Sequence, residues 1–233
     1  MDEKSAAETI RLNKFLAERV GLSRREADVA IERGVVTVNG EVAKIGARVV
    51  AGDVVKYEGR SVDFEKEFSY VAFNKPVGYV CSRRAQGDAP TIYELLPEGM
   101  RSLKTVGRLD KDSSGLILLT DDGDFALAMT HPRFYKDKVY EVKLDRELEP
   151  LHQQEIAEFG VMLPDGLSKL GLTRLSDQSR AEWRVLMHEG RNRQIRRTFE
   201  ALGYRVVGLH RIQFGKYMLS GLEEGKFEEV PKV

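Results

Sequence analysis

Two aspartates lie in the polar segment 106–115 (VGRLDKDSSG), which leads directly into the apolar run 116–119 (LILL). A strand of this composition is expected to be buried and rigid. Binding and catalytic side chains are concentrated on loops that such strands hold in place. Asp110 is therefore a candidate catalytic carboxylate. The arginine-rich segment 189–197 (EGRNRQIRR) is a candidate source of its counter-charge, with both acting on a polyanionic substrate.

The Asp110 loop is also compatible with a calcium site or with a purely structural turn. Its acidic and polar residues fall at positions one, three, five, six and twelve of an EF-hand-like calcium loop. The apolar strand that follows, and an Asp rather than a Glu at position twelve, argue against a metal there. An Asp in a turn also commonly caps a helix or fixes the turn through its own hydrogen bonds. Spacing alone makes Asp110 a candidate and does not assign its role.

The arginine-rich segment is predicted to lead into a helix over residues 192–202, which Gly203 ends. At about 100° per residue, Ile195, Phe199 and Leu202 share one apolar stripe. This stripe is expected to pack against the core and to fix the direction of the arginines around it.

Arg196 lies at the border of the apolar stripe, whereas Arg193 and Arg197 point away from the core. A guanidinium at such a border can be half-buried and can pair with a carboxylate through two hydrogen bonds. The outer two arginines suit phosphates. The alternative is a solvated basic face whose surface ion pairs contribute little energy. The sequence leaves these alternatives open.

The composition indicates a soluble globular chain. Of the 233 residues, 42% are hydrophobic and 32% are charged, which suits one large domain or one medium and one small domain. No apolar run approaches the roughly 20 residues that span a bilayer, and the acidic N-terminal segment lacks the apolar core of a secretory signal. Cys81 is the only cysteine, which excludes internal disulfides and a cysteine zinc site. We expect a cytoplasmic protein without a structural metal.

Basic residues are unevenly distributed, although Lys and Arg together number 37 and so do Asp and Glu. Residues 11–57 carry nine Lys and Arg against six Asp and Glu, and residues 187–211 carry six Arg against two Glu. Acidic residues gather near both ends. This segregation is compatible with a nucleic-acid partner, although a net charge of zero taken alone argues against one.

Residues 11–57 are predicted to form a module of two helices and a small sheet. Apolar residues recur at helical spacing over residues 12–20, and Ser23 with Glu26 matches a capping box at the start of a second helix. The Asn-Gly pair at 39–40 between two alternating segments indicates a β-hairpin. A module of this size is too small for a deep core and suits recognition.

Lys14, Arg24 and Arg25 give this module a possible phosphate site. The two arginines lie in the opening turn of the second helix, where free backbone amides and nearby cations favour anions. The alternative is an ordinary solvent-exposed surface, and one such module is weak evidence by itself.

The remaining sequence is expected to form a larger domain. Residues 58–67 are charged and weakly patterned, so we place a linker there, with a disordered tail at 1–10 and the larger domain at 68–233. Strand and helix patterns mix without regular βαβ alternation, which predicts an α+β fold on a mixed, largely antiparallel sheet. Strands are expected at 70–76, 104–106, 116–119, 139–144, 183–187, 204–207 and 212–214, and helices at 123–129, 149–159 and 192–202.

Tyr140 lies on one of these predicted strands, flanked by Lys136 and Lys138. A tyrosine on a strand usually fills a core or covers a sheet. An alternative role is to stack on a nucleobase, which is worth about 1–3 kcal/mol per base.

The motifs together resemble those of the bacterial pseudouridine synthases that act on small- and large-subunit ribosomal RNA and begin with an S4 RNA-binding domain. The S4 domain is matched by RLNKFLAERVGLSRREAD and GVVTVNG. The successive motifs of the catalytic domain are matched by FNKPVGYV, VGRLDKDSSGLILLTDDG, KVYEV and EGRNRQIRRTFEALGY. The resemblance spans nearly the whole chain, and the GRLD and RNRQIRR segments are far more specific together than either is alone.

This resemblance implies a role for each candidate residue. Asp110 matches the catalytic aspartate, Tyr140 matches the tyrosine that stacks on the target uracil, and Arg196 matches the basic residue that pairs with the aspartate. The candidate RNA contacts are Lys14, Arg24, Arg25, Arg108, Arg191, Arg193 and Arg197. The reaction implied is the isomerisation of uridine to pseudouridine, which involves neither a redox change nor hydrolysis, so no cofactor or metal is expected.

Ribosomal RNA or a ribosomal assembly intermediate is the expected partner of a monomeric enzyme, with large-subunit RNA preferred and small-subunit RNA as the alternative. The residues leave open whether Asp110 attacks the sugar, attacks the base or removes a proton from the ribose. They also leave two other functions. A non-catalytic RNA-binding or ribosome-assembly factor would not need Asp110. A hydrolase would use Asp110 and Asp112 as an acid/base pair, although no partner motif accompanies them.

Overall fold

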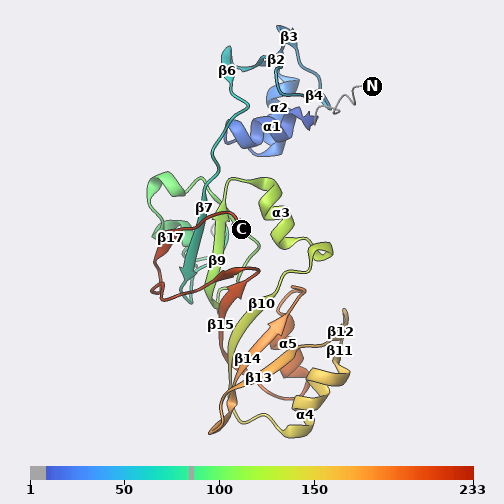
Figure 1. Cartoon of the computed structure of the whole chain (residues 1–233), viewed down its shortest axis with the longest axis vertical. Coiled ribbons are helices and arrows are strands. Elements are labelled where there is room, and N and C mark those ends of the chain that lie inside the picture. The colour runs from blue at the N-terminus through green and yellow to red at the C-terminus, as the bar shows by residue number, and fades with distance from the viewer. Residues whose placement is uncertain (1–8, 84–86) are drawn as a thin grey trace, which may run out of the picture. The chain divides into compact units, whose positions relative to one another are not determined.

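The computed structural model describes residues 9–83 and 87–233, and the chain divides into two compact units after Phe68 (Figure 1). Each unit has its own hydrophobic core, and each is described by itself. The elements of the first unit are β1 (Ile10–Arg11), α1 (Leu12–Arg19), α2 (Arg24–Glu32), β2 (Val36–Val38), β3 (Glu41–Val42), β4 (Arg48–Val49), β5 (Val55–Tyr57) and β6 (Arg60–Val62).

The two helices of the first unit form as predicted. The Ser23 hydroxyl accepts a hydrogen bond from the Glu26 backbone N–H at 3.2 Å, and the Glu26 carboxylate accepts one from the Ser23 N–H at 2.6 Å. This reciprocal pair is the predicted capping box. Residues 39–40 both adopt positive φ, 52° and 88°, which is the backbone of the predicted tight hairpin between β2 and β3.

The predicted tail and linker differ from the structure in part. Of the tail, residues 1–8 lie outside the described residues, and Ile10 pairs with Val49 in a two-stranded sheet. Within the expected linker, β6 pairs with β5, and the Phe64 ring packs on Phe15 with ring centroids 4.4 Å apart. A short edge strand carries its polar side chains outward, so its local pattern resembles a linker. Residues 60–64 belong to the first unit.

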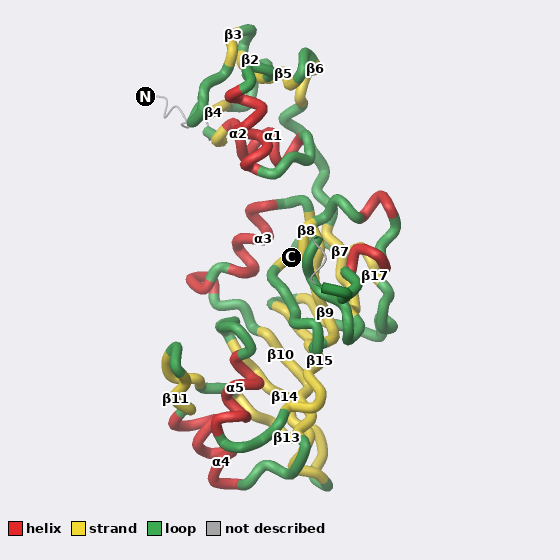
Figure 2. Tube along the Cα trace, turned by 180° about the vertical axis from the view of Figure 1, so that it is seen from behind, coloured by secondary structure: helices red, strands yellow, loops and turns green. Residues whose placement is uncertain are grey.

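The second unit is built on one large sheet (Figure 2). Its strands are β7 (Tyr70–Lys75), β8 (Lys104–Val106), β9 (Ser114–Thr120), β10 (Lys138–Leu144), β11 (Val161–Leu163), β12 (Gly166–Ser168), β13 (Gly171–Ser176), β14 (Ser179–Met187), β15 (Val206–Phe214), β16 (Tyr217–Met218) and β17 (Phe227–Glu229). Its helices are α3 (Gly123–Thr130), α4 (Pro150–Gln154) and α5 (Gln194–Ala201), with 3₁₀ turns at Ile92–Leu95, Glu98–Met100 and Pro132–Phe134 and a π-helical turn at Glu155–Phe159.

The strand order in this sheet is β13-β14-β10-β15-β9-β7-β17, with β8 added on β9 and β16 on β15. Neighbouring strands are antiparallel except β15 and β9, which are parallel. The predicted α+β fold on a mixed, largely antiparallel sheet is confirmed. The β11–β12 hairpin forms a separate two-stranded sheet.

Several predicted strands are longer than expected. The two short strands predicted at 204–207 and 212–214 are one continuous strand, β15. His210 and Arg211 interrupt the apolar alternation in the sequence, which is why the pattern breaks there. The hairpin 161–168 and the strands 171–176 and 227–229 were not predicted, since they are short or largely exposed on one side.

The run 116–119 forms the centre of β9 and is buried on both faces, as its unbroken apolar composition indicates. Ile117 and Leu119 belong to the larger core, which includes the apolar stripe of α5. Leu116 and Leu118 pack with α3 in a second core on the opposite face. The loop that precedes β9 is therefore attached to a strand held from both sides. None of the helices in residues 9–83 and 87–233 has the length and apolar composition of a membrane-spanning segment.

Candidate active site in a basic cleft

The strands β9, β10 and β15 bring the candidate residues together. Tyr140 on β10 is the register partner of Arg211 on β15, and Arg211 is in turn the parallel partner of Gly115 at the start of β9. The two backbones approach so closely that a Cβ on Gly115 would lie 2.3 Å from the Arg211 carbonyl oxygen. Gly115 also has φ +104°, a conformation that favours glycine. This contact fixes the start of β9 against β15, and Asp110 and Tyr140 line the same cleft.

A cleft of about 490 Å³ opens between the Asp110 loop, these strands and the start of α5. Its polar and charged lining includes Arg108, Asp110, His131, Lys136, Lys138, Tyr140, His188, Glu189, Arg191, Arg193 and Arg211. Cations outnumber carboxylates in this lining, so the cleft suits an anionic or acceptor-rich ligand.

Asp110 lies in the cleft with its side chain 38% exposed, next to the guanidinium of Arg193. The Arg193 Nη1 is 3.5 Å from Asp110 Oδ2 and 3.0 Å from Asp112 Oδ1, while Nη2 is 2.9 Å from Asp112 Oδ2. Arg193 thus binds Asp112 through two hydrogen bonds and contacts Asp110 from the same position. These hydrogen bonds, with the nearby charge of Arg196, lower the pKa of Asp112.

Arg196 holds the backbone of the Asp110 loop rather than the Asp110 carboxylate. Its Nη2 donates to the Asp112 carbonyl at 2.7 Å and its Nη1 donates to the Val206 carbonyl at 2.8 Å, with Nε 3.3 Å from the Asp112 carboxylate. The side chain is 11% exposed, so the predicted border position is confirmed. Among the described residues, the ion pair of the Asp110 carboxylate is with Arg193, at 3.5 Å, whereas the carboxylate next to Arg196 is that of Asp112.

The position of Arg193 follows from the residue at which the helix begins. Helix α5 begins at Gln194, and Arg193 is its N-cap with a left-handed backbone, φ 47° and ψ 32°. A helical wheel started at Asn192 directs Arg193 away from the core. The left-handed turn instead directs its side chain toward the two aspartates. A non-glycine residue in this conformation is strained and is often found at functional sites.

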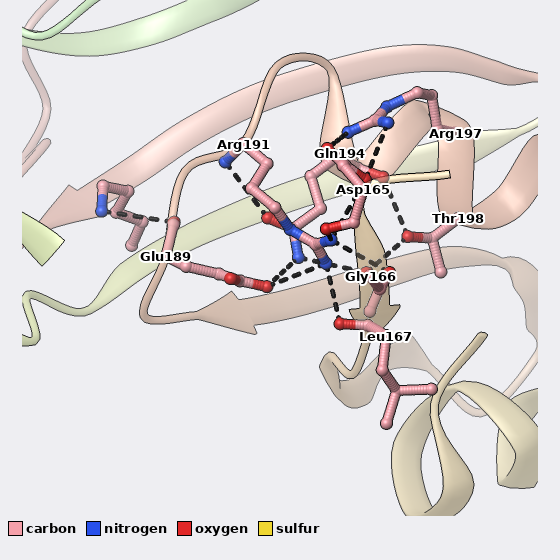
Figure 3. Close-up of polar contacts among 10 residues, drawn as sticks. Asp165, Gly166, Leu167, Glu189, Arg191, Gln194, Arg197 and Thr198 are labelled. Carbon is pink, nitrogen blue, oxygen red and sulfur yellow. Dashed lines mark hydrogen bonds and ion pairs between the residues drawn. The ribbon is translucent and has the colours of Figure 1, made fainter. Parts of the chain in front are cut away.

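Arg191 and Arg197 are both engaged by the hairpin β11–β12 (Figure 3). Arg197 binds the Asp165 carboxylate at 3.0 and 2.7 Å. Arg191 also reaches Asp165, at 3.1 Å, and donates to the carbonyls of Gly166 and Leu167 at 3.0 and 2.8 Å. These contacts clamp the hairpin onto the start of α5. Both arginines were predicted to contact RNA, and in this structure their guanidinium groups stabilise the protein.

Beneath the contacts of Arg191 and Arg197 lies a chain of buried hydrogen bonds. Gln194 donates to the Ser168 hydroxyl at 3.1 Å and to the Glu189 carboxylate, and the hydroxyls of Ser168 and Thr198 are 2.7 Å apart. Because buried polar groups are costly unless they are paired, this chain favours a single position for the first turn of α5.

Tyr140 is 7% exposed, belongs to the core and also lines the cleft. The two roles that the sequence left open, core packing and a platform for a base, are therefore compatible at this position. Arg108 is exposed in the loop and lines the cleft.

Two buried cations near the loop were not recognised as candidates from the sequence. Lys75, at the end of β7, is fully buried and donates to the carbonyls of Pro76 and Ser113 at 2.9 and 2.6 Å. Burial lowers its pKa. Arg211 is 2% exposed and faces the cleft beside Tyr140. A charged residue within a strand otherwise rich in apolar residues is the sequence signal that could have singled out both.

In the first unit, Arg24 and Arg25 are exposed in the first turn of α2, beside the Ser23 cap. Lys14 lies on α1, 3.9 Å from the Glu18 carboxylate. Across residues 9–83 and 87–233, no group of three or more His, Cys, Asp or Glu side chains is arranged to hold a metal ion. The carboxylate of Asp112 is instead held by guanidinium groups.

Comparison with known proteins gives matches for both units. Residues 69–201 match the RNA pseudouridylate synthase family and residues 10–55 match the S4 domain. The ribosomal small subunit pseudouridine synthase A of Pasteurella multocida (strain Pm70) is 38% identical over 224 residues, which cover 95% of this chain and 96% of that protein. The ribosomal large subunit pseudouridine synthase B of Bacillus subtilis (strain 168) is 32% identical over 225 residues, 94% of this chain and 91% of that protein.

A crystal structure of a pseudouridylate synthase is similar to the chain as a whole. Its TM-score is 0.67 at 36% sequence identity, with 95% of this chain and 96% of that chain covered. The similarity thus includes both the S4 domain and the unit that carries the cleft.

Proposed function

Because this chain belongs to the RNA pseudouridylate synthase family and begins with an S4 domain, we propose that it isomerises uridine to pseudouridine in ribosomal RNA, with Asp110 as the catalytic carboxylate. One observation carries the assignment of Asp110. Its half-exposed carboxylate lies in a cleft lined by cations, and the same cleft is lined by the Tyr140 ring. Relatives named for small-subunit and large-subunit ribosomal RNA support the substrate class.

The reaction keeps every heavy atom of the nucleotide and leaves its overall composition unchanged. The bond between ribose C1′ and uracil N1 breaks, the base turns, C5 bonds to C1′, the C5 proton leaves and N1 takes up a proton. A base must first leave its stack, which costs a few kcal/mol. Stacking on Tyr140 would return about 1–3 kcal/mol of this. Contacts between backbone phosphates and exposed cations such as Arg108 would supply more.

The arginines around Asp110 have different roles. Arg193 holds the Asp110 and Asp112 carboxylates in one position, and we assign it the pairing role first expected of Arg196. Arg196 becomes a positioning residue, because it holds the loop through two backbone carbonyls. Arg191 and Arg197 keep the start of α5 in place. Phosphate contacts from these two would require them to leave Asp165 or to use their remaining donors.

The S4 domain supplies a second contact to the RNA in this proposal. Lys14, Arg24 and Arg25 would bind phosphates, since the first turn of α2 offers exposed cations at a helix N-terminus. We assign residues 11–57 to RNA binding and residues 68–233 to catalysis, in a monomeric enzyme of the bacterial cytoplasm, where ribosomes are assembled.

A hydrolase that uses Asp110 and Asp112 as an acid/base pair is disfavoured. Such a pair needs one carboxyl group that stays protonated near neutral pH. The two guanidinium groups next to Asp112 lower its pKa and favour the ionised form. Asp112 is therefore a poor general acid.

The test of the proposed function is release of tritium from ribosomal RNA fragments labelled at uridine C5. The wild-type protein is expected to release tritium, and Asp110→Asn is expected to release none while it still binds RNA. Asp177→Asn is a matched control, because Asp177 is exposed at the tip of the β13–β14 hairpin. Release by Asp110→Asn at the wild-type rate would favour a different catalytic group. Binding without release by the wild type would favour a non-catalytic factor.

We propose large-subunit ribosomal RNA as the target, on the resemblance of the RLNK, NKPVG and NRQIRR motifs, with small-subunit RNA as the alternative. Mapping of pseudouridines in the ribosomal RNA of a strain that lacks the gene distinguishes these two targets. Loss of a site from large-subunit RNA supports the first choice, and loss from small-subunit RNA supports the second.

A further inference from the structure

Arg211 is buried in the wall of the cleft and is incompletely paired. It is 2% exposed, and its Nε donates to the Leu116 carbonyl at 2.7 Å. Its Nη2 is buried and has no hydrogen-bond partner among the described residues. A buried charged group without partners is costly, and such groups in native structures usually have a functional reason.

The groups around Arg211 increase the free-energy cost of burying its charge. Arg211 forms no salt bridge within the part of the chain that the structure describes. The guanidinium carbon of Arg211 lies 4.7 Å from the ring centroid of Phe214 and 6.0 Å from that of Tyr140. Lys138 lies over the same Phe214 ring at 5.4 Å, and its pKa is lowered by burial and by the charge of Arg211. Two cations thus share one wall of the cleft, and the charges of Asp137 and Glu189 only partly offset the lowering of the pKa of Lys138.

A ligand in the cleft could complete this arrangement. A guanidinium only donates hydrogen bonds, so the free Nη2 needs an acceptor, and the surplus positive charge favours an acceptor that becomes negative. Arg211 and Tyr140 are register partners on neighbouring strands, so their side chains lie on one face of the sheet. A base stacked on Tyr140 would have its edge within reach of the guanidinium.

Resting on the proposed function, we infer that Arg211 contacts the extruded uracil: its Nη2 donates a hydrogen bond to the O2 or O4 carbonyl oxygen and stabilises the negative charge that these oxygens acquire during the reaction. When the C1′–N1 bond breaks with its electron pair on the base, that pair is delocalised onto both carbonyls. When C5 then bonds to C1′ and the C5 proton is replaced by a proton on N1, the base is neutral again. The guanidinium keeps all its protons throughout.

The alternative is a purely structural role, in which the Nε bond to Leu116 joins β15 to β9. Both roles predict that removal of Arg211 lowers activity, so loss of activity does not separate them. They differ in how the enzyme responds to a change in the base. Sulfur is a weaker hydrogen-bond acceptor than oxygen, so replacing the contacted oxygen weakens the contact in the wild type alone.

The experiment compares RNA substrates that carry uridine, 2-thiouridine or 4-thiouridine at the target position, in single-turnover reactions of the full chain. For the wild type, we expect one of the two thio substrates to react at least tenfold more slowly than uridine. For Arg211→Gln, we expect the uridine rate to fall about 100-fold or more, as on loss of an oxyanion-hole donor. We define the thio penalty as the rate with uridine divided by the rate with the thio substrate. In Arg211→Gln this ratio should fall to between about 0.5 and 2, because the contact is already absent.

Arg180→Gln is the matched control. Arg180 also donates from Nε to a backbone carbonyl, that of Leu148 at 2.8 Å, and lies over an aromatic ring, that of Trp183 at 5.7 Å, but it does not line the cleft. We expect it to keep the wild-type thio penalty. If Arg211→Gln does not fold by circular dichroism, Arg211→Met, which lacks a hydrogen-bond donor, replaces it with the same expected loss of the thio penalty.

Two results would overturn the inference. One is a thio penalty that is unchanged in the Arg211 variant. The other is a wild type that processes both thio substrates as fast as uridine, a result that needs no variant. The proposed function is tested separately, because turnover of uridine by the wild type is required for it and is independent of the thio ratios.

Discussion

Arg193 and Arg196 are three residues apart, yet they hold different parts of the Asp110 loop. Arg193 binds the two carboxylates and is 42% exposed, whereas Arg196 is 11% exposed and binds two backbone carbonyls. The difference follows from the left-handed backbone of Arg193, which places one arginine before the helix and the other within it. The positive charge of Arg193 therefore acts on the Asp110 carboxylate, whereas the forked guanidinium of Arg196 holds the backbone of the loop.

This division predicts different outcomes for two substitutions. Arg193→Ala is expected to lower single-turnover activity roughly tenfold or more with little loss of stability, because it removes an exposed ion pair at the carboxylate. Arg196→Ala is expected to lower activity and also to lower the free energy of unfolding by about 1–3 kcal/mol, because it leaves buried carbonyls unpaired. Urea unfolding and single-turnover kinetics measure the two effects.

Lysine at each position is the control for this pair. Arg193→Lys keeps the charge and should recover part of the activity. Arg196→Lys should not recover stability, because one ammonium cannot span the carbonyls of Asp112 and Val206 as the fork of a guanidinium does. If Arg193→Ala were fully active and only Arg196→Ala were impaired, the pairing of Arg196 with Asp110 that the sequence predicts would be correct.

At the scale of elements, the site depends on how closely β9 and β15 approach. Both cores hold β9 in place, and Gly115 allows its first residues to touch the backbone of Arg211. The one parallel pairing among the described strands of the sheet occurs here. The same contact therefore positions the Asp110 loop before β9 and the Arg211 side chain on β15.

Gly115→Ala is expected to lower the free energy of unfolding by more than about 3 kcal/mol and to abolish activity. Its Cβ would lie 2.3 Å from the Arg211 carbonyl oxygen and 2.5 Å from the Arg211 nitrogen, so the strands would have to separate. Gly78→Ala is the control: Gly78 has a similar φ of +95° but no atom within 4 Å of its Cβ position. It should cost only the backbone strain, about 1–2 kcal/mol. Equal effects in urea unfolding would show that strain rather than the strand contact dominates.

At the scale of the whole second unit, three distant segments meet at Asp122. Its carboxylate accepts hydrogen bonds from Tyr70 at 2.7 Å and Lys232 at 2.8 Å, and it caps α3 through the Phe125 N–H at 2.9 Å. Burial by itself raises the pKa of Asp122, but the bonds from Lys232, Phe125 and Tyr70 lower it overall. Burial and the bond to Asp122 raise the pKa of Tyr70 to about 12, so its phenol remains a donor.

Asp122→Asn is expected to lower the free energy of unfolding by about 1–2 kcal/mol at pH 7, since it removes the charge and keeps an acceptor for the helix cap. The folded pKa lies below the ordinary value of 3.8, so the ionised carboxylate contributes fully above that value and its contribution is lost as pH falls through the lower folded pKa. The difference between wild type and variant in urea unfolding should therefore shrink as pH falls below 3.8. A difference that stayed constant from pH 7 to acid would exclude the charge as its cause.

The sequence by itself determined the features that depend on local chemistry. The capping box of Ser23, the tight turn at 39–40 and the buried strand at 116–119 follow from spacings of a few residues and formed as predicted. Of the predicted stripe, Ile195 and Phe199 are buried on α5, and Leu202 follows the helix and is partly buried. The paired motifs around Asp110 and Arg196 identified the family, because a combination of two specific segments rarely occurs by chance.

Only the tertiary structure decided which side chains meet. Arg193 rather than Arg196 contacts Asp110, Arg191 and Arg197 bind Asp165, and Arg211 lies beside Tyr140. Each of these depends on a left-handed residue at a helix start or on the packing and register of segments far apart in the chain. Such contacts join residues from 26 to 83 positions apart, so no local pattern of hydrophobicity or charge encodes them.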